Sequence, residues 1–127
     1  MPYNFTIQEK QNYILLEVSG NRVRGKGVEH MVPIWTQTTD VCIAKGVYNI
    51  LAILKLTGRV PVLDSYTIAN NIEKLGLGKG FKVALFDTNE ESRKDNKFTE
   101  TVATNRGYLV KVFDNEQGAL SWLLKSG

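Results

Sequence analysis

VYNILAILKL, residues 47–56, is the stretch of sequence that decides the fold. Apart from Tyr48, Asn49 and Lys55 it is wholly apolar. It is about half as long as the roughly 20-residue segment that a membrane-spanning helix requires, so we predict no membrane span. An apolar run of this length is typical of a strand that is covered on both faces. We therefore predict that residues 47–56 form the central strand of a sheet.

Strands and helices alternate on both sides of this run. Residues 3–9 and 13–18 read as two strands joined by a polar turn, which predicts an antiparallel hairpin. Residues 28–42 carry apolar side chains at helical spacing, and so do residues 68–75, which end at Gly76. The other predicted elements are strands at 81–86 and 108–113, a helix from Thr88 to about residue 105, and a last helix capped within residues 114–117.

Polar residues mark the expected helix starts. Asp64 or Ser65 is placed to cap the helix that ends at Gly76. Thr88, with Glu91 three residues later, has the spacing of a capping box for the following helix.

The order of elements is ββαβαβαβα, which predicts an α/β fold in a single domain, residues 1–127. Right-handed crossovers would make the sheet parallel after its opening antiparallel hairpin. We expect a mixed five-stranded sheet with about four helices.

Composition argues against several classes of protein. The net charge of +3 comes from 16 basic and 13 acidic residues spread along the chain, without the dense basic stripe of nucleic-acid binders. The first residues lack the pattern of a secretory signal, and one cysteine cannot close an intramolecular disulfide. We therefore expect a cytoplasmic protein with no nucleic-acid partner.

No catalytic constellation can be read from the sequence. His30 is the only histidine and Cys42 the only cysteine. Twelve residues apart on one helix, they would be about a third of a turn apart around the axis and roughly 18 Å apart along it. We predict that the protein is not an enzyme and needs no metal or cofactor, and that Cys42 is a buried apolar residue.

The predicted topology gathers several loops at one edge of the sheet. Strands end and helices begin there, so unpaired N–H groups and helix dipoles favour anions. The loop at residues 20–27 belongs to this edge and carries Arg22, Arg24 and Lys26, which form a candidate anion-binding loop. The alternative is that these three side chains only keep a surface loop soluble.

Residues 50–75, a strand ending in LKL and a helix opening with LDS, resemble the STAS family, the domain of sulfate transporters and anti-sigma factor antagonists. In that family an Asp-Ser-Ser/Thr-Gly signature opens this helix, and its hydroxyl residue is phosphorylated by an anti-sigma kinase. Asp64 and Ser65 match the first two positions of the signature. Tyr66 stands where the phosphorylated hydroxyl residue lies in the family, and Thr67 replaces the glycine.

YLVKVFDNEQGALSWLL, residues 108–124, is similar to the ending of the SpoIIAA-like branch of that superfamily. These are small bacterial proteins that are also grouped with lipid-binding SEC14-type (CRAL-TRIO) domains. The resemblance implies a SpoIIAA-like fold and a non-enzymatic regulatory or protein-interaction role. It makes Asp64, Ser65, Tyr66 and Thr67 the candidate phosphorylation switch or partner-binding edge, with Tyr66 as the favoured contact residue; the alternative is that Asp64 or Ser65 only caps a helix.

Two further hypotheses come from apolar residues. Met31, Trp35 and Phe98 could line a pocket for a lipid or other apolar small molecule, with the basic loop as a headgroup site; the alternative is that they are ordinary core. Trp122 lies about 100° from Leu123 on the last helix and could be exposed enough to support a homodimer; a packed edge aromatic is the alternative.

Overall fold

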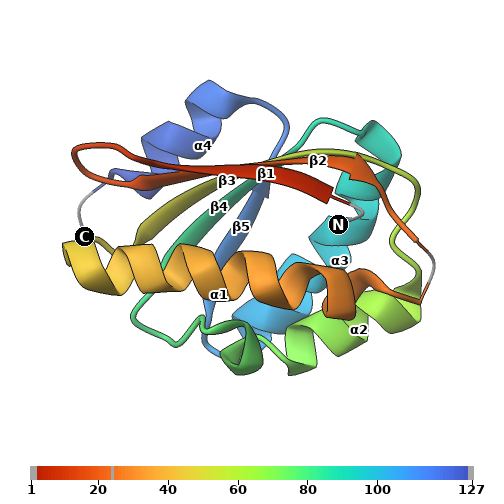
Figure 1. The fold of residues 1–127 in the computed structure, drawn as a ribbon. Coiled ribbons are helices and arrows are strands. Elements are labelled where there is room, and N and C mark those ends of the chain that lie inside the picture. The colour runs from red at the N-terminus through yellow and green to blue at the C-terminus, as the bar shows by residue number, and fades with distance from the viewer. Residues whose placement is uncertain (1–2, 24, 126–127) are drawn as a thin grey trace.

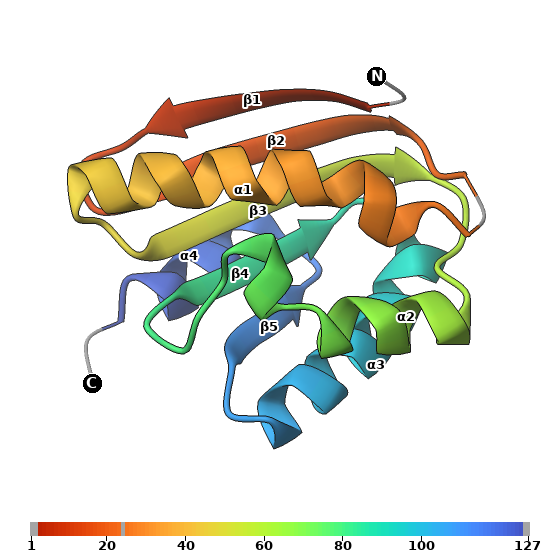
Figure 2. The same ribbon diagram turned by 60° about the horizontal axis from the view of Figure 1, so that its bottom comes forward.

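The computed structural model describes residues 3–23 and 25–125. Its centre is a five-stranded sheet in the order β1-β2-β3-β4-β5, which Figure 2 shows from the side of α1 and α2. The first two strands are antiparallel, and β2 to β5 are parallel. The predicted α/β class and mixed sheet are confirmed. The strands are β1 (Tyr3–Glu9), β2 (Ile14–Asn21), β3 (Asn49–Thr57), β4 (Lys82–Asp87) and β5 (Leu109–Phe113).

Three helices cover one face of the sheet and one covers the other (Figure 1). Because β2 to β5 follow each other in chain order, right-handed crossovers place every connecting helix on the same face. These are α1 (Gly27–Lys45), α2 (Val62–Asn70) with the short 3₁₀ helix η1 (Glu73–Leu75), and α3 (Glu90–Asn105). The last helix, α4 (Glu116–Leu123), packs on β3, β4 and β5 from the opposite side.

The central strand β3 is buried on both faces, as predicted. Ile50, Ala52 and Leu54 face the main core under α1, α2 and α3, whereas Leu51 and Ile53 face α4. This alternation follows from the two-residue period of a strand. It explains why the run is almost continuously apolar in sequence.

The helix caps differ from the sequence-based expectations. Pro61 occupies the N-cap position of α2, and no side chain caps this helix. Asp64 and Ser65 lie inside its first turns, so the prediction that one of them is the cap is wrong. The predicted helix ending at Gly76 is in fact two pieces, α2 and η1, and Gly76 ends the second in a left-handed conformation (φ 90°).

The N-cap of α3 also lies one residue later than predicted. The N-cap is Asn89, whose side-chain oxygen accepts from the backbone N–H groups of Glu91 and Ser92 at 3.1 and 3.5 Å. Thr88 instead donates its hydroxyl to the backbone oxygen of Leu54. The capping box predicted from Thr88 and Glu91 is therefore not formed. For α4 the cap falls within the predicted segment, on Asn115.

Within residues 3–23 and 25–125, no helix combines the length and apolar character needed to cross a membrane.

Candidate functional site

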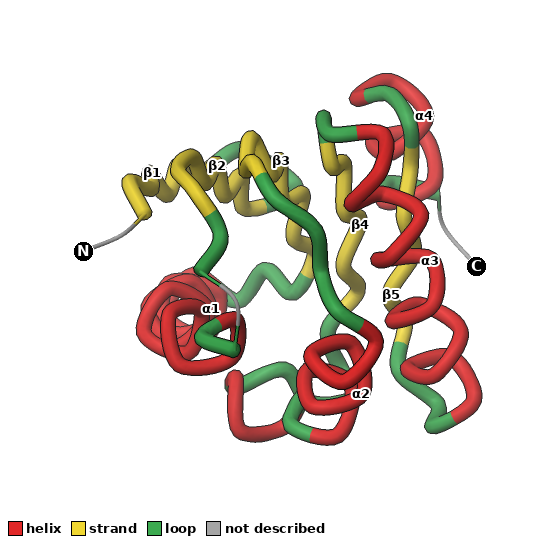
Figure 3. The backbone as a smooth tube through the Cα atoms, turned by 90° about the vertical axis from the view of Figure 1, so that its right-hand side faces the viewer, coloured by secondary structure: helices red, strands yellow, loops and turns green. Residues whose placement is uncertain are grey.

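The candidate site lies at the edge of the sheet where β2, β3 and β4 end and α1, α2 and α3 begin. Figure 3 faces this edge and shows α2 between α1 and α3. Contacts between α2 and both neighbouring helices agree with this view. The predicted gathering of loops at one edge therefore occurs, and it brings together residues that are far apart in sequence.

A buried carboxylate, Asp87, organises this edge. It ends β4 and has no solvent exposure. Its Oδ2 accepts from Arg22 Nη2 at 3.2 Å, Ser92 Oγ at 2.8 Å and Asn96 Nδ2 at 2.8 Å, and its Oδ1 accepts from the backbone N–H of Asn89 at 3.0 Å. Such a charge is tolerated in a protein interior only when it is paired and hydrogen-bonded. Sequence reasoning missed Asp87; the available sign was an acidic residue directly after the apolar strand FKVALF.

The two described cations of the candidate anion-binding loop, Arg22 and Lys26, do not act as one group. Arg22 points inward to Asp87, and its Nη1 also donates to the backbone oxygen of Gly58 at 3.2 Å. Lys26 pairs with Glu29 on the surface of α1 at 3.2 Å. Arg24 lies outside the described residues. The charge of Arg22 is thus already compensated, and this residue is a structural ion-pair partner rather than a soluble loop residue.

A second arginine, Arg59, is compensated in the same way. Its Nε and Nη2 donate to the two carboxylate oxygens of Asp95 on α3, at 2.8 and 2.7 Å. The backbone N–H of Val60 adds a bond to Asp95 Oδ2 at 2.9 Å. The hydrogen bond from Arg59 lowers the pKa of Asp95, and the same pairing raises the pKa of Arg59. This pair fastens the segment after β3 to α3.

The four residues of the candidate switch have different environments on α2. Ser65 is only 1% exposed, so its hydroxyl is inaccessible to a kinase in this conformation. Asp64 is half-buried beside the start of α1. Tyr66 and Thr67 are exposed, and the Tyr66 ring packs edge-on against Phe98 at 5.0 Å between centroids.

Exposed apolar side chains cluster at the start of α2. Val62, Leu63 and Tyr66 are all exposed, Leu63 by 77%. We call these three residues the α2 patch. Val23, on the loop that precedes α1, is another exposed apolar residue of the same edge. The sequence marked only Tyr66 for exposure.

Behind the α2 patch, a cavity of about 100 Å³ lies between the sheet and the three helices on that face. Met31 and Trp35 line it, as predicted, but Phe98 does not and packs against Tyr66 instead. The charged lining residues, Arg22, Arg59 and Asp64, belong to the site edge. The rest of the wall is largely apolar and includes Leu54, Leu56, Ile68, Ile72, Leu85 and Val110.

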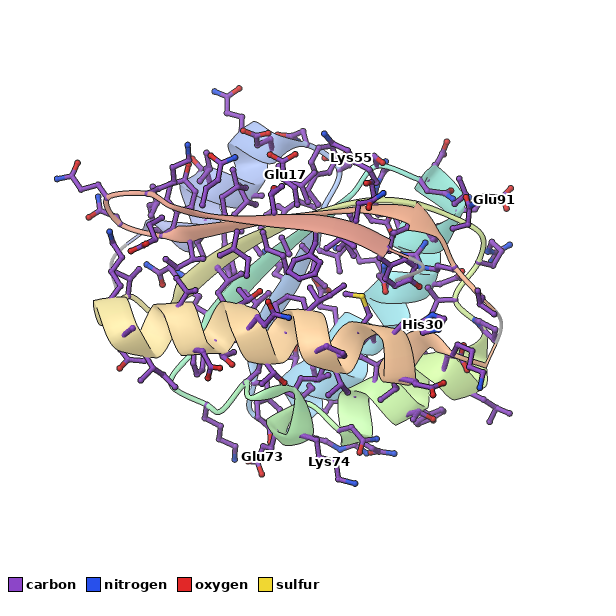
Figure 4. The ribbon with its side chains drawn as sticks, in the orientation of Figure 1. Glu17, His30, Lys55, Glu73, Lys74 and Glu91 are labelled. Atoms are coloured by element: carbon purple, nitrogen blue, oxygen red, sulfur yellow. The ribbon has the colours of Figure 1, made fainter. Side chains whose placement is uncertain are left out.

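His30 and Cys42, the two residues considered for nucleophilic chemistry, lie near opposite ends of α1. Cys42 is fully buried, as predicted, and burial raises the pKa of its thiol to about 11. His30 packs edge-on against Tyr3 at 5.6 Å between ring centroids, near the other end of α1 (Figure 4). In the described part of the chain, no three His, Cys, Asp or Glu side chains gather as a metal site requires.

Trp122, the residue marked for self-association, is half-buried on α4. Its ring packs against Phe113 at 5.7 Å, and Lys82 Nζ lies 4.7 Å from the ring centroid. This arrangement is the packed edge aromatic that stood as the alternative, and the homodimer stays a prediction without support from Trp122.

No protein-family model and no curated protein sequence matches the chain. Among solved structures, the fold is similar to the crystal structure of an anti-sigma factor antagonist from Mycobacterium paratuberculosis. The two share 13% sequence identity over 97% of this chain and 95% of the other, with a TM-score of 0.58. An uncharacterized protein with a SpoIIAA-like fold from Shewanella loihica PV-4 also matches, with 17% identity, 95% and 93% coverage and a TM-score of 0.49. The chain therefore shares the fold of an anti-sigma factor antagonist, as its sequence resemblance predicts.

Proposed function

We propose that this protein is a non-enzymatic regulatory module that docks a partner protein through the α2 patch. The observation that carries this proposal is the exposure of Val62, Leu63 and Tyr66 side by side at the start of one helix. The fold shared with an anti-sigma factor antagonist supports a regulatory role.

The α2 patch has the features of a contact surface. Single exposed apolar residues are common, but adjacent large ones mark interaction sites. The Leu63 side chain packs little against the protein core, since it is mostly exposed. Tyr66 is held by its edge-on contact with Phe98, so it loses little conformational freedom when a partner binds. An aromatic anchor beside aliphatic side chains is the usual composition of an interface centre.

Charge substitution in the patch tests the docking proposal. Affinity capture from the native host, with quantitative mass spectrometry, would compare the wild-type protein with the Leu63→Asp variant. Ile43→Asp, at an exposed apolar position on α1, is the matched control. We expect a partner that the wild-type and Ile43→Asp proteins capture and that Leu63→Asp loses. Equal capture by all three would refute docking through the α2 patch.

Phosphorylation would regulate this docking most directly at Tyr66 or Thr67. A phosphate on Tyr66 would bring nearly two negative charges into the apolar patch. Ser65 is buried, so a phosphate there would require α2 to open. We expect phosphopeptide analysis of protein from its native host to find modified Tyr66 or Thr67. Phosphate found on Ser65 alone would contradict this placement.

The cavity supports a second candidate function, a carrier or sensor of an apolar small molecule. It lies directly behind α2, between Ile68 and Ile72 of the α2–η1 segment and Met31 and Trp35 of α1. Apolar cavities of this kind stay dry and bind apolar ligands. Native mass spectrometry of protein purified from its host tests this function, and a protein that never carries a small molecule would count against it.

A further inference from the structure

The cavity behind α2 has a size that limits its ligand. Its volume is about 100 Å³, compared with about 150 Å³ for an engineered apolar cavity that binds benzene. A single ring or a short alkyl group is therefore the largest apolar body that fits without rearrangement. A full phospholipid tail would require the helices to move apart.

One polar side chain that lines the cavity has a buried hydroxyl without a partner. Thr99, on α3, lines the cavity and is 5% exposed. Its Oγ1 is buried and has no hydrogen-bond partner among the described residues. By contrast, the buried helical threonines Thr38 and Thr39 donate their hydroxyls to the backbone oxygens of Ile34 and Thr36, at 2.8 and 3.0 Å. An unpaired buried hydroxyl costs free energy, so a ligand that supplies its partner gains affinity.

The charges around the cavity disfavour an ionised ligand. Arg22 is paired with Asp87, and Arg59 with Asp95. Asp64 adds a further negative charge to the lining. Among the described residues, both arginines that line the cavity are therefore already paired with carboxylates. The apolar interior of the cavity also penalises any charge that enters it.

We propose that the cavity binds a small uncharged molecule, a single ring or short alkyl group that carries one hydroxyl or carbonyl group, and that Thr99 turns its buried Oγ1 toward that group when the ligand binds. This proposal rests on the second candidate function and specifies its ligand class. It also places the bound molecule against α2, so occupancy can alter the α2 patch.

Three ring compounds test the ligand class. Benzene carries the ring alone, phenol adds a hydroxyl, and benzoate adds a charge at neutral pH. Titrations would follow the indole N–H signals of the two tryptophans by nitrogen–proton NMR. Trp35 lines the cavity, whereas Trp122 lies on the opposite face of the sheet and serves as an internal reference. We expect phenol to shift the Trp35 signal with the highest affinity, benzene to bind more weakly, and benzoate not to bind.

Thr99→Val tests the hydrogen bond, because valine keeps the shape of threonine and removes only the hydroxyl. We expect the affinity for phenol to fall about tenfold, which corresponds to the upper end of the net free energy that one hydrogen bond contributes. The affinity for benzene should be unchanged or increased. Val110→Phe, which fills the cavity from β5, should abolish binding of both ring compounds. The NMR spectrum itself verifies that each variant is folded.

The outcomes separate the ligand class from the candidate function. If benzoate binds as tightly as phenol, or if Thr99→Val leaves phenol affinity unchanged, the proposed ligand class is wrong while the cavity remains a binding site. If none of the three compounds shifts the Trp35 signal in the wild-type protein, both the ligand class and the carrier or sensor function fail.

Discussion

At the scale of single residues, Asp87 is the group whose loss should cost most. Removing it leaves the Arg22 guanidinium and the Ser92 and Asn96 side chains without their common acceptor. Breaking a buried charge pair by truncating one partner typically costs 3–5 kcal/mol, and since Arg22 retains some exposure we expect Asp87→Ala to lower the free energy of unfolding by about 3 kcal/mol. Urea unfolding followed by circular dichroism measures this change.

Glu17→Ala is the matched control for that measurement. Glu17 accepts from Lys55 Nζ at 3.2 Å on the sheet face opposite α1, where both side chains reach solvent (Figure 4). An exposed pair of this kind contributes under about 1 kcal/mol. Equal losses for the two variants would show that Asp87 is not the organising group of the edge.

The sequence could not reveal the Asp87 network because its charged partner, Arg22, is 65 positions away. Arg22 sits in a glycine-rich, charged loop that reads as solvent-exposed, and nothing local distinguishes it from Arg24 or Lys26. The burial of Cys42, in contrast, follows from its place on the apolar stripe of its own helix, and this prediction is confirmed.

The buried thiol of Cys42 should be unreactive in the folded protein. Its pKa is raised to about 11 by burial, so almost none of it is thiolate at neutral pH, and it has no solvent exposure. We expect a thiol-specific reagent such as dithionitrobenzoate to label it only after the protein is unfolded in guanidinium chloride. Rapid labelling of the native protein would show that α1 opens away from the core.

At the scale of elements, the start of α3 offers a direct comparison of two adjacent residues. Asn89 makes the observed cap, whereas Thr88 makes a single hydroxyl bond to Leu54. We expect Asn89→Ala to cost about 1 kcal/mol of stability and Thr88→Ala clearly less. Thermal or urea unfolding of both variants decides the matter, and a larger loss for Thr88→Ala would favour the capping box predicted from sequence.

The elements themselves were predictable, but the starts of α2 and α3 were not. Apolar periodicity located each strand and helix, because burial of one face dominates their stability. The α2 cap was wrong because Pro61, with its fixed backbone angle, can take the N-cap position without offering a side-chain acceptor. Because the helix starts three or four residues earlier than predicted, Ser65 lies at a buried position and not at the helix entrance, so its hydroxyl is not accessible for phosphorylation in this conformation.

At the scale of the whole molecule, a sheet that is parallel after an opening antiparallel hairpin could be predicted from the alternation of elements. The cavity could not, because its volume depends on how closely three helices pack on a twisted sheet. Phe98 illustrates the difficulty: it is a large apolar residue of α3, yet it packs against Tyr66 and does not line the cavity. The gathering of loops at one edge could be predicted from the topology, whereas the pairing of Arg22 with Asp87 could not.

The pairing of Arg59 with Asp95 makes the stability of the whole molecule depend on pH. Because the folded pKa of Asp95 is lowered, this carboxylate stabilises the folded state above its unfolded pKa of about 3.9 and loses that contribution as pH falls through its lower folded value. We expect Asp95→Asn to be less stable than wild type at pH 7, with a difference that shrinks as the pH is lowered below about 4. Urea midpoints measured from neutral pH to about pH 3 give this dependence.

Asp40→Asn, at an exposed position on α1, is the control and should differ little from wild type throughout. A stability difference for Asp95→Asn that stays constant over this range would mean that the charge of Asp95 contributes nothing to stability.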